Sequence, residues 1–505
     1  MTRTRTLLLS VIGIAVVALV VLGVYLVAKA APDDGGDFAA PKPVATPAPA
    51  GLSAFYTQQL SFEDCGSARC TWVKVPVDYA DPEGDTTRIR VKIHPATSDG
   101  ATRSLFVNPG GPGGSALDFA DTLEDTFADD VLKTYDIVGV DPRGVGESSP
   151  LECLTDKQFD AFTQTDPDPD DPAEVTALRR SMTELGQACV KRSGSLAAHV
   201  STVEAAKDMD VVRALLGRSK LDWFGASYGT QLGSVYADLF PDRVGRMVLD
   251  GAVDPSLDSV EGSFAQATGF QRAIEAYAEK CAKTDSCPIG TDPEAGVQKV
   301  ADLLQQLDAE PLPAGNGRQL TEGNAFYGIA VTLYDEKTWQ YLTQGLAAAF
   351  KGDGSVLQIL SDAYFERQQD GSYKTNGGQV IYAVSCLDAK DDLTLSETEA
   401  QVKRFQKASP VFGAALAWGA LDCTDWPIKA TNPLPTIDAK GAPPIVVIGT
   451  TRDPATPYES AEALASQLDS GVLVTREGDG HTAYLSGNTC IVKAIDAYLV
   501  EGTVP

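Results

Sequence analysis

One serine in this chain stands in a turn that few folds can accommodate. Residues 225–229 read Gly-Ala-Ser-Tyr-Gly; they follow a β-rich run at 221–224 and precede a helical pattern that begins near Thr230. A strand-to-helix turn this tight leaves no room for side chains at the flanking glycines, and its strained geometry lifts the serine oxygen above the sheet. The motif therefore predicts that Ser227 is a nucleophile at the edge of a sheet.

A serine hydroxyl is a weak nucleophile at neutral pH and needs a base. The chain has three histidines. Where a G-x-S-x-G serine lies on such a sheet, the acid and the histidine follow it in the chain, which excludes His94 and His199. We therefore expect His481 to be the general base, because it lies in a Gly-rich turn at 478–481 after a predicted strand. The alternative is a surface histidine in a turn.

The acid that orients the imidazole should lie in the loop after the preceding strand. Asp453 has this position, since it follows a β-rich run at 444–448. Its expected role is to fix the imidazole tautomer and to stabilise the imidazolium. Asp479 is the alternative acid, but it lies so close to His481 in the chain that it would have to fold back onto its own turn.

A second glycine-rich loop is expected to supply hydrogen-bond donors for a developing oxyanion. Residues 108–114 read Asn-Pro-Gly-Gly-Pro-Gly-Gly and follow a predicted strand at 105–107. We assign the donors to the backbone N–H groups of Gly111 and Tyr228, each contributing roughly 3 kcal/mol to the tetrahedral intermediate. A phosphate-binding loop is the alternative, but no Lys-Ser/Thr pair follows it. The Asp-Pro-Arg-Gly segment at 141–144 is interpreted as the structural floor beside this loop.

Short β-rich runs alternate with helical stretches, which is typical of a mostly parallel sheet covered by helices. We predict an α/β-hydrolase fold in which a large helical lid interrupts the sheet. The predicted divisions are a signal peptide or signal anchor at 1–30, a Pro/Ala-rich linker at 31–50, the first part of the core at 51–255, the helical lid at 256–438, and the rest of the core at 439–505. The Asp/Pro run at 165–172 lacks the glycine and terminal glutamate of a calcium loop and is interpreted as a solvated loop.

The amino-terminal segment predicts export. Arg3 and Arg5 precede an apolar run at 7–27 that is long enough to cross a hydrocarbon core, so the rest of the chain should lie outside the cytoplasm. The length of the run favours a retained anchor, while Ala-Lys-Ala at 28–30 offers a cleavage site. We expect an extracellular or cell-envelope protein, either anchored through this run or secreted after cleavage.

The net charge limits the possible partners, and the cysteine and histidine content limits the possible nucleophiles and cofactors. The 41 basic and 69 acidic residues give a net charge of −28, which would repel phosphate backbones, so nucleic acid is not expected as a partner. Nine cysteines in an exported chain should mostly form disulfides, although spacing alone does not decide the pairing. Plausible pairs are Cys65–Cys70, Cys153–Cys189, Cys281–Cys287 and Cys386–Cys423, which leaves Cys490. No cysteine lies in a glycine-flanked turn, and three scattered histidines offer no metal-ligand spacing, so we expect neither a cysteine nucleophile nor a metal or other cofactor.

These segments together resemble the tripeptidyl aminopeptidases and the related proline-iminopeptidase-like serine exopeptidases secreted by actinobacteria. The likeness rests on residues 108–114, 141–146, 225–229, 453–457 and 480–481, together with the cysteine-bearing segments 385–388 and 422–427, and it covers nearly everything from about residue 60 onward. The resemblance implies release of short peptides from free amino termini beneath a helical lid. It also implies a carboxylate near the lid that binds the substrate ammonium group, for which Asp388 is the candidate.

The expected function is therefore an exported serine exopeptidase that releases tripeptides or dipeptides through an acyl-enzyme. A carboxylesterase or lipase is the alternative enzyme, because the same triad serves amides and esters. A catalytically silent module that binds a partner at the cell surface is the alternative outside enzymes, but such a protein has no reason to keep the complete triad and oxyanion loop. The sequence leaves the oligomeric state open.

Overall fold

The computed structural model describes residues 43–44, 48–98, 103–390, 393–429, 432 and 434–505. The predicted signal segment at 1–30 and most of the predicted linker at 31–50 lie outside the described residues and stay predictions. Within the described part of the chain, no helix has the length and hydropathy needed to cross a membrane.

The described residues form one large sheet that is antiparallel at one edge and parallel elsewhere. Its strands are β1 (Glu63–Cys65), β2 (Ala68–Pro76), β3 (Thr86–His94), β4 (Arg103–Asn108), β5 (Tyr135–Val140), β6 (Leu221–Ala226), β7 (Val244–Asp250), β10 (Ile445–Arg452) and β11 (Gly471–Asp479). Their spatial order is β1-β2-β3-β5-β4-β6-β7-β10-β11, and every pair from β5 to β11 is parallel. The fold class is that of an α/β-hydrolase, as the alternating pattern predicts.

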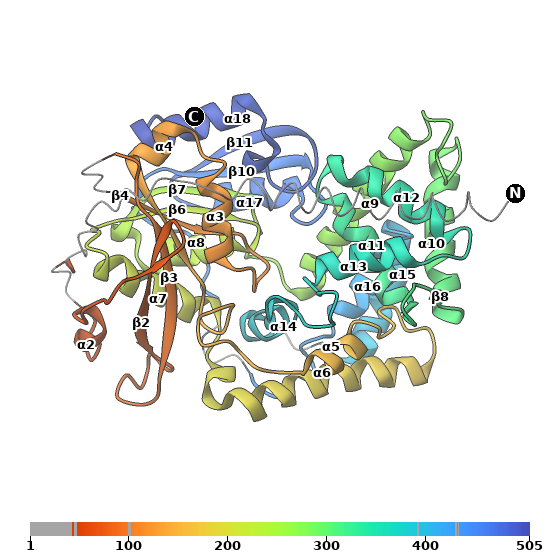
Figure 1. Ribbon diagram of the computed structural model, residues 1–505, viewed down its shortest axis with the longest axis horizontal. Coiled ribbons are helices and arrows are strands. Elements are labelled where there is room, and N and C mark those ends of the chain that lie inside the picture. The colour runs from red at the N-terminus through yellow and green to blue at the C-terminus, as the bar shows by residue number, and fades with distance from the viewer. Residues whose placement is uncertain (1–42, 45–47, 99–102, 391–392, 430–431, 433) are drawn as a thin grey trace, which may run out of the picture. The chain divides into compact units, whose positions relative to one another are not determined.

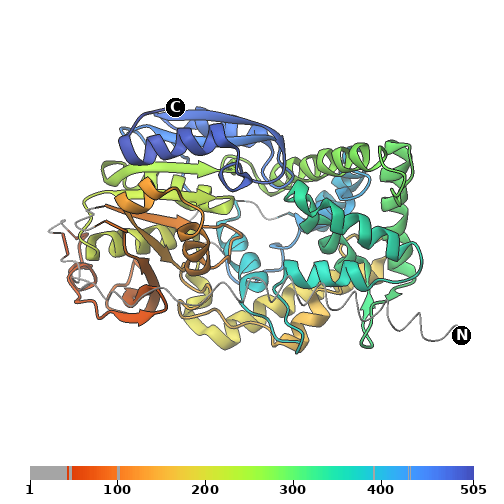
Figure 2. The same ribbon diagram turned by 45° about the horizontal axis from the view of Figure 1, so that its top comes forward.

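Helices cover both faces of this sheet (Figures 1 and 2). One face carries α3 (Ala116–Glu124), α4 (Asp129–Thr134) and α18 (Thr489–Glu501), and the other carries α7 (Thr202–Leu215), α8 (Tyr228–Leu239) and α17 (Tyr458–Gln467). Strand β6 is buried along its whole length, as expected for a central strand covered on both faces. Because parallel strands end at the same edge, the loops after β4, β6, β10 and β11 meet there.

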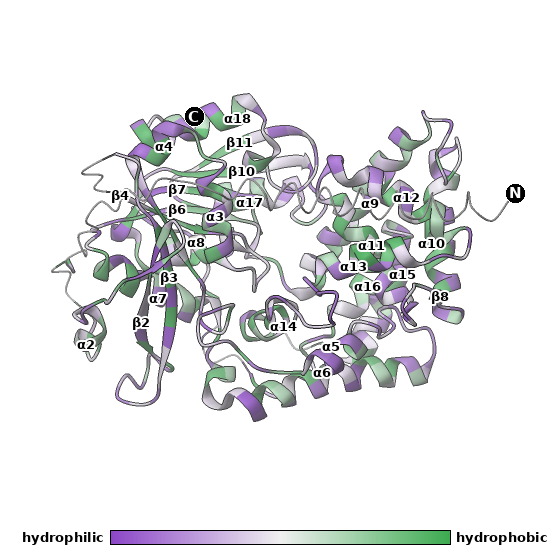
Figure 3. Ribbon diagram, in the orientation of Figure 1, coloured by the Kyte–Doolittle hydropathy of each residue, from purple (hydrophilic) through white to green (hydrophobic). Residues whose placement is uncertain are grey.

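The chain between β7 and β10 forms the helical lid. Its elements are α9 (Ser259–Cys281), α10 (Pro293–Ala309), the short strands β8 (Leu312–Pro313) and β9 (Gln319–Leu320), α11 (Glu322–Leu333), α12 (Trp339–Ala349), α13 (Ser355–Tyr364), α14 (Gly377–Asp388), α15 (Leu395–Ala408) and α16 (Gly413–Gly419). The lid has an apolar core of its own, in which α11 is almost entirely buried. Figure 3 shows hydrophobic residues concentrated on this helix.

A second insertion, between β5 and β6, joins the lid. It contains α5 (Asp156–Phe162) and α6 (Pro172–Ser193), which lie within the range predicted as core. Arg179 on α6 donates to Asp425 at 2.7 and 3.0 Å, and the Phe159 ring of α5 packs edge-on against Phe365. A side chain at Gly186 would collide with Pro427, at 2.5 Å. The lid is therefore built from two separate stretches of chain.

The sequence predicts a solvated loop before α6, but the structure places acidic side chains of this loop against other acidic residues of the lid. Carboxylate oxygens of Asp166, Asp308 and Glu322 lie within 4.8 Å of one another. Glu322, the first residue of α11, is 5% exposed. Burial and the negative charge of Asp168 raise the pKa of Glu322. The tertiary structure thus gathers acidic residues that are distant in sequence.

The disulfides follow the pairs that the spacing made plausible. Cys65–Cys70, Cys153–Cys189, Cys281–Cys287 and Cys386–Cys423 are all bonded, and Cys490 is free and exposed. The bond from Cys386 to Cys423 ties α14 to the segment that follows α16.

Candidate active site

Ser227 occupies the turn between β6 and α8, with φ 56° and ψ −126°. This left-handed conformation is strained for a residue with a side chain. A Cβ at Gly225 would lie 2.3 Å from the Gly229 carbonyl oxygen, and a Cβ at Gly229 would lie 2.7 Å from the Asn108 carbonyl oxygen, so both flanking positions need glycine. The Trp223 indole donates to that same oxygen at 3.1 Å and holds the turn closed. The geometry is that of a nucleophile elbow.

Asp453 and His481 are brought together by the loops after β10 and β11. His481 Nδ1 lies 2.8 and 3.0 Å from the two carboxylate oxygens of Asp453. The carboxylate also accepts the N–H groups of Thr456 at 2.9 Å and Thr482 at 3.1 Å, and Asp453 is 2% exposed. An acceptor at Nδ1 places the proton there and leaves Nε2 free to accept one.

Asp250, at the end of β7, connects this pair to Ser227. Its carboxylate accepts the N–H groups of Ala483 and Tyr484, both at 2.8 Å, and its backbone oxygen accepts the N–H of Ser227 at 2.9 Å. A Cβ on the next residue, Gly251, would lie 3.3 Å from His481 Cε1. The serine turn and the histidine loop are therefore anchored to the same two residues.

The imidazole is buried, and its Nε2 has no hydrogen-bond partner among the described residues. Without substrate, the bond from a serine to its base is often long, so an Nε2 without a partner agrees with the predicted role of His481 as general base. Burial alone would lower the pKa of His481, but the charge and hydrogen bond of Asp453, with a smaller contribution from Asp250, raise it above its usual value. Burial raises the pKa of Asp250 to about 6.

The alternative acid is engaged elsewhere. Asp479 forms a two-pronged ion pair with Arg452, at 2.5 and 2.7 Å. The other histidines also have acidic partners: His94 Nε2 lies 2.8 Å from Asp121, and His199 Nδ1 lies 2.7 Å from Glu204. Among the described histidines, His481 is therefore the one that the chain brings to the serine turn.

The glycine-rich loop after β4 packs directly on the nucleophile turn. A Cβ at Gly110 would lie 2.7 Å from Ser227 Cβ and 2.9 Å from the Tyr228 nitrogen. The Gly110 N–H donates to Asn108 Oδ1 at 3.0 Å, whereas the N–H groups of Gly111 and Tyr228 donate no hydrogen bond to any described residue. Their assignment as oxyanion donors stays a prediction with which this geometry agrees.

The Asp-Pro-Arg-Gly segment after β5 supports that loop. The Asp141 carboxylate accepts Ser115 Oγ at 3.0 Å and the Ala116 N–H at 2.8 Å, at the start of α3. Arg143 is fully buried and pairs with Asp208 at 2.7 and 2.8 Å. The structural interpretation of this segment agrees with these contacts.

Asp388 lies at the end of α14 with both carboxylate oxygens occupied. It accepts the Thr202 N–H at 3.0 Å, the Thr202 hydroxyl at 2.5 Å and Gln231 Nε2 at 3.1 Å, and it is 6% exposed. The same Thr202 hydroxyl lies 2.5 Å from the Tyr228 hydroxyl. Binding of a substrate ammonium by Asp388 stays a prediction, but these contacts argue for a positioning role beneath Tyr228.

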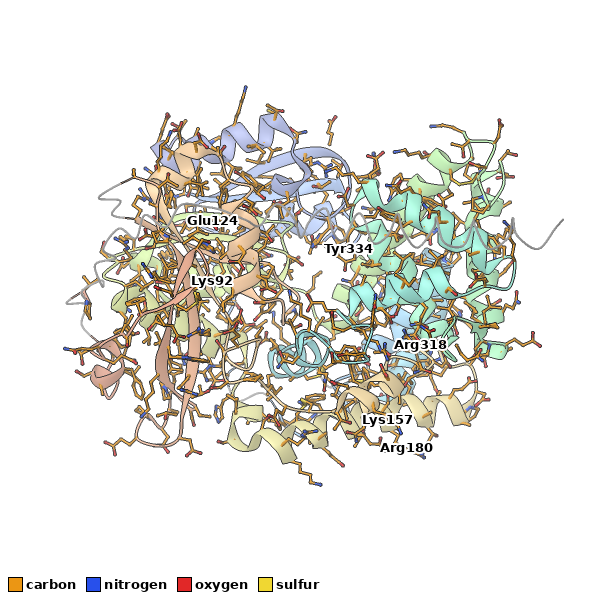
Figure 4. The ribbon with its side chains drawn as sticks, in the orientation of Figure 1. Lys92, Glu124, Lys157, Arg180, Arg318 and Tyr334 are labelled. Atoms are coloured by element: carbon orange, nitrogen blue, oxygen red, sulfur yellow. A yellow bond between two sulfur atoms is a disulfide. The ribbon has the colours of Figure 1, made fainter. Side chains whose placement is uncertain are left out.

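Tyr334, at the carboxyl end of α11, brings the lid into contact with the histidine, and no sequence pattern pointed to this residue. Its backbone oxygen accepts the His481 N–H at 2.8 Å, and the two rings meet edge to face with centroids 5.2 Å apart. Figure 4 places Tyr334 on the side of the lid that faces the sheet. Burial raises the pKa of Tyr334 well above its usual value, so the phenol stays neutral.

The surface cavity and the candidate metal-binding groups of the described residues do not include the predicted catalytic residues. A surface cavity of about 840 Å³ lies at the amino-terminal ends of β4, β6 and β7, opposite the edge that carries Ser227. Within the described part of the chain, two groups of side chains have ligand atoms close enough to hold a metal ion: Asp166 with Asp308 and Glu322, and Asp78 with His199 and Glu204. Neither group contains a residue of the predicted site.

A strained serine, a buried histidine held by an aspartate and a glycine loop against the serine turn define a serine hydrolase of the α/β-hydrolase fold. Residues 409–505 match a family model described as TAP-like protein. The chain is 37% identical to serine protease Hip1 of Mycobacterium tuberculosis over 87% of this chain and 86% of that protein. It belongs to the family of tripeptidyl aminopeptidase-like hydrolases.

Two further relatives carry different names. A Mycobacterium tuberculosis protein named carboxylesterase B is 40% identical, over 87% of this chain and 85% of its own. A tripeptidyl aminopeptidase of Streptomyces lividans is 34% identical, over 88% of this chain and 84% of its own. The family thus includes proteins named for peptide and for ester hydrolysis.

Proposed function

We propose that this protein is an exported serine exopeptidase that releases short peptides, tripeptides or dipeptides, from free amino termini through an acyl-enzyme. The observation that carries the proposal is the Asp453–His481 pair anchored on Asp250 beside the Ser227 turn. The names of the peptidase relatives support peptides as the substrate class.

In the proposed mechanism, Ser227 Oγ attacks the carbonyl carbon of the scissile peptide bond while His481 Nε2 takes the hydroxyl proton. The resulting oxyanion accepts hydrogen bonds from the N–H groups of Gly111 and Tyr228. The imidazolium, stabilised by Asp453, gives its proton to the leaving amine, and the C–N bond breaks. Water then repeats the sequence on the acyl-enzyme and releases the short peptide.

Two measurements test this proposal. A fluorophosphonate probe should label the wild-type protein and fail to label Ser227→Ala, which would discard a silent binding module. Fluorogenic peptides with free amino termini should be hydrolysed faster than the same peptides with acetylated termini. If acetylation makes no difference to kcat/KM, the exopeptidase proposal is wrong, although the hydrolase class stands.

A carboxylesterase is the second candidate, favoured by the relative named for that activity. The triad serves either substrate, and only the lid and the pocket distinguish an amide with a charged amino end from a neutral ester. Comparison of kcat/KM for a short acyl p-nitrophenyl ester and for a tripeptide amide separates the two. A large excess in favour of the ester would support the second candidate.

Export is part of the proposal. The apolar run at 7–27 and the four disulfides support an oxidising location outside the cytoplasm. Fractionation of the producing cells, with and without residues 1–30, tests this, and an anchored form should be released from the membrane fraction only by detergent.

A further inference from the structure

Carboxylates from three elements of the lid meet at the start of α11. Oxygens of Asp166 in the loop before α6, of Asp308 near the end of α10 and of Glu322 on α11 lie within 4.8 Å of one another. The carboxyl group of Asp168 also reaches Glu322. The loop by itself lacks the spacing of a calcium loop, but the folded chain adds oxygen ligands from the two helices.

The Glu322 carboxylate is buried without a donor. The residue is 5% exposed, and no N–H or hydroxyl group of the described residues donates to its side chain. Asp168 does not replace a donor, because an ionised carboxylate only accepts hydrogen bonds. Arg318, the basic residue nearest to Glu322 along the chain, donates to Asp362 instead, at 2.8 Å. A carboxylate withdrawn from water in this way is costly unless a positive group reaches it.

Contacts that do not use the carboxylates hold the loop against the start of α11. Asn324 donates from Nδ2 to the carbonyl oxygen of Thr163 at 3.1 Å. A Cβ at Gly323 would lie 2.6 Å from the carbonyl oxygen of Thr165, so the loop can approach α11 this closely only because the helix has glycine there. The acidic side chains of the loop are therefore brought to Glu322 by the packing of the backbone and not by their own charge.

The other group of candidate ligands is already satisfied by the protein. The Glu204 carboxylate accepts the Ser201 hydroxyl at 3.0 Å and faces His199 Nδ1 at 2.7 Å. The guanidinium of Arg143 lies 3.9 Å from the same carboxylate and would repel a cation. A metal ion is therefore not needed to balance this second group.

We infer that Asp166, Asp308 and Glu322, with Asp168 beside them, bind one calcium ion. Carboxylate oxygens suit a hard cation, and Ca²⁺ accepts irregular arrangements of about six to eight oxygens, whereas Mg²⁺ demands a near-ideal octahedron. These residues include no histidine or cysteine, which disfavours zinc. The ion joins the insertion between β5 and β6 to the insertion between β7 and β10, a link that none of the four disulfides makes. The inference does not depend on the substrate of the enzyme.

Calcium binding to the full chain, first freed of metal with a chelator, tests the inference. Isothermal titration in about 0.1 M KCl, which screens the general attraction of divalent ions to an acidic surface, should show one Ca²⁺ per chain with a Kd of about 0.1 to 1 mM. About 10 mM Ca²⁺ should raise the melting temperature by about 1 to 3 °C, and the same concentration of Mg²⁺ should raise it by less. An equal rise with Mg²⁺ would overturn the assignment of calcium.

Two variants locate the ion. Glu322→Gln and Asp308→Asn should each weaken calcium binding at least about 10-fold, whereas Asp302→Asn, at an exposed position on α10, should bind calcium as the wild-type protein does. Asp308 is also exposed, so its substitution tests the site without disturbing the apolar core of the lid, and melting temperatures in chelator report whether each variant folds. The inference would be overturned by a wild-type protein that binds no calcium at about 10 mM. Equal calcium affinity in the three variants would overturn it as well.

Discussion

Asp250 illustrates how one buried residue can hold the geometry of the predicted site from outside the predicted triad. Its backbone oxygen fixes the amide of Ser227, and its carboxylate fixes two amides immediately after His481. Its side chain forms no hydrogen bond with the Ser227 hydroxyl or with the His481 imidazole; its partners are backbone amides. The end of β7 thus holds the serine turn and the histidine loop in position relative to each other. A search of the sequence for catalytic residue types does not detect such a role.

Replacement of Asp453 by Asn should lower kcat by about ten-thousand-fold with little change in fold, because an amide no longer enforces the Nδ1-protonated tautomer. Steady-state kinetics on a tripeptide substrate measure this. Asp479→Asn is the control, since it breaks only the pair with Arg452 and should cost less than about ten-fold. Equal losses in the two variants would contradict the assignment of the acid.

The pH dependence of kcat/KM should report the raised pKa of His481. The base accepts a proton only when neutral, so activity should fall as the pH drops through that pKa, and the midpoint of this acid limb should lie above 6.5. The residual activity of Asp453→Asn should show the limb at lower pH, because the charge that raises the pKa is gone. A limb that does not move in this variant would contradict the proposed cause of the shift.

At the scale of elements, α11 connects three parts of the molecule. Its first residue, Glu322, meets the acidic loop before α6, its middle carries Tyr327, and the residue that ends it, Tyr334, contacts His481. A shift of this helix would therefore move Glu322, Tyr327 and Tyr334 together, and with them the contacts to the acidic loop and to His481. The near-complete burial of α11 resists such a shift.

The glycine loop after β4 should tolerate no side chain at its contact with the serine turn. Gly110→Ala places a methyl group against Ser227 Cβ and the Tyr228 nitrogen, so the oxyanion donors should be displaced and kcat should fall at least about 100-fold. Gly262→Ala on α9 is the control, since nothing lies within 4 Å of its Cβ. Kinetics and melting temperatures of both variants test this, and wild-type kcat in Gly110→Ala would refute it.

The acidic contact at the start of α11 should make stability depend on pH. Burial and repulsion from neighbouring carboxylates raise the pKa values of Asp166, Asp168 and Glu322. Carboxylates with raised folded-state pKa values stabilise the fold while protonated, and this contribution is lost as the pH rises. The free energy of unfolding should therefore fall between pH 5.5 and pH 8, because the folded-state pKa values lie above the unfolded values of about 4.

Urea unfolding at the two pH values, with a chelator present, measures that change. Glu322→Gln removes one ionisable member and should make the dependence shallower, while Asp302→Asn, at an exposed position on α10, should leave it unaltered. An equal or steeper dependence in Glu322→Gln would show that this contact is not its source.

At the scale of the whole molecule, a disulfide bond joins two segments of the lid. The Cys386–Cys423 bond spans 37 residues and should stabilise the fold by about 4 kcal/mol through the unfolded chain. The double variant Cys386→Ser/Cys423→Ser should therefore melt at a lower temperature than the wild-type protein, as calorimetry measures. An unchanged melting temperature would show that noncovalent packing suffices.

Much of the core could be predicted because its signals are local. The strand before Ser227 was expected at 221–224 and is Leu221–Ala226, and the strand before Asp453 was expected at 444–448 and is Ile445–Arg452. Short buried runs and tight glycine turns depend on neighbours within a few residues. The sequence does not predict that α5 and α6 belong to the lid, because helical periodicity does not indicate whether a helix packs on the sheet or on the lid.

Local sequence was enough to predict the serine turn, the chain order of the proposed catalytic residues, the glycine loop and the plausible cysteine pairs, since each is a requirement on backbone sterics or on spacing along the chain. It took the folded molecule to show that Asp388 is saturated by Thr202 and Gln231 and that Tyr334 contacts His481. Whether a buried carboxylate is satisfied depends on donors from distant elements. That pairing is fixed by how the insertions pack on the sheet, which no local pattern encodes.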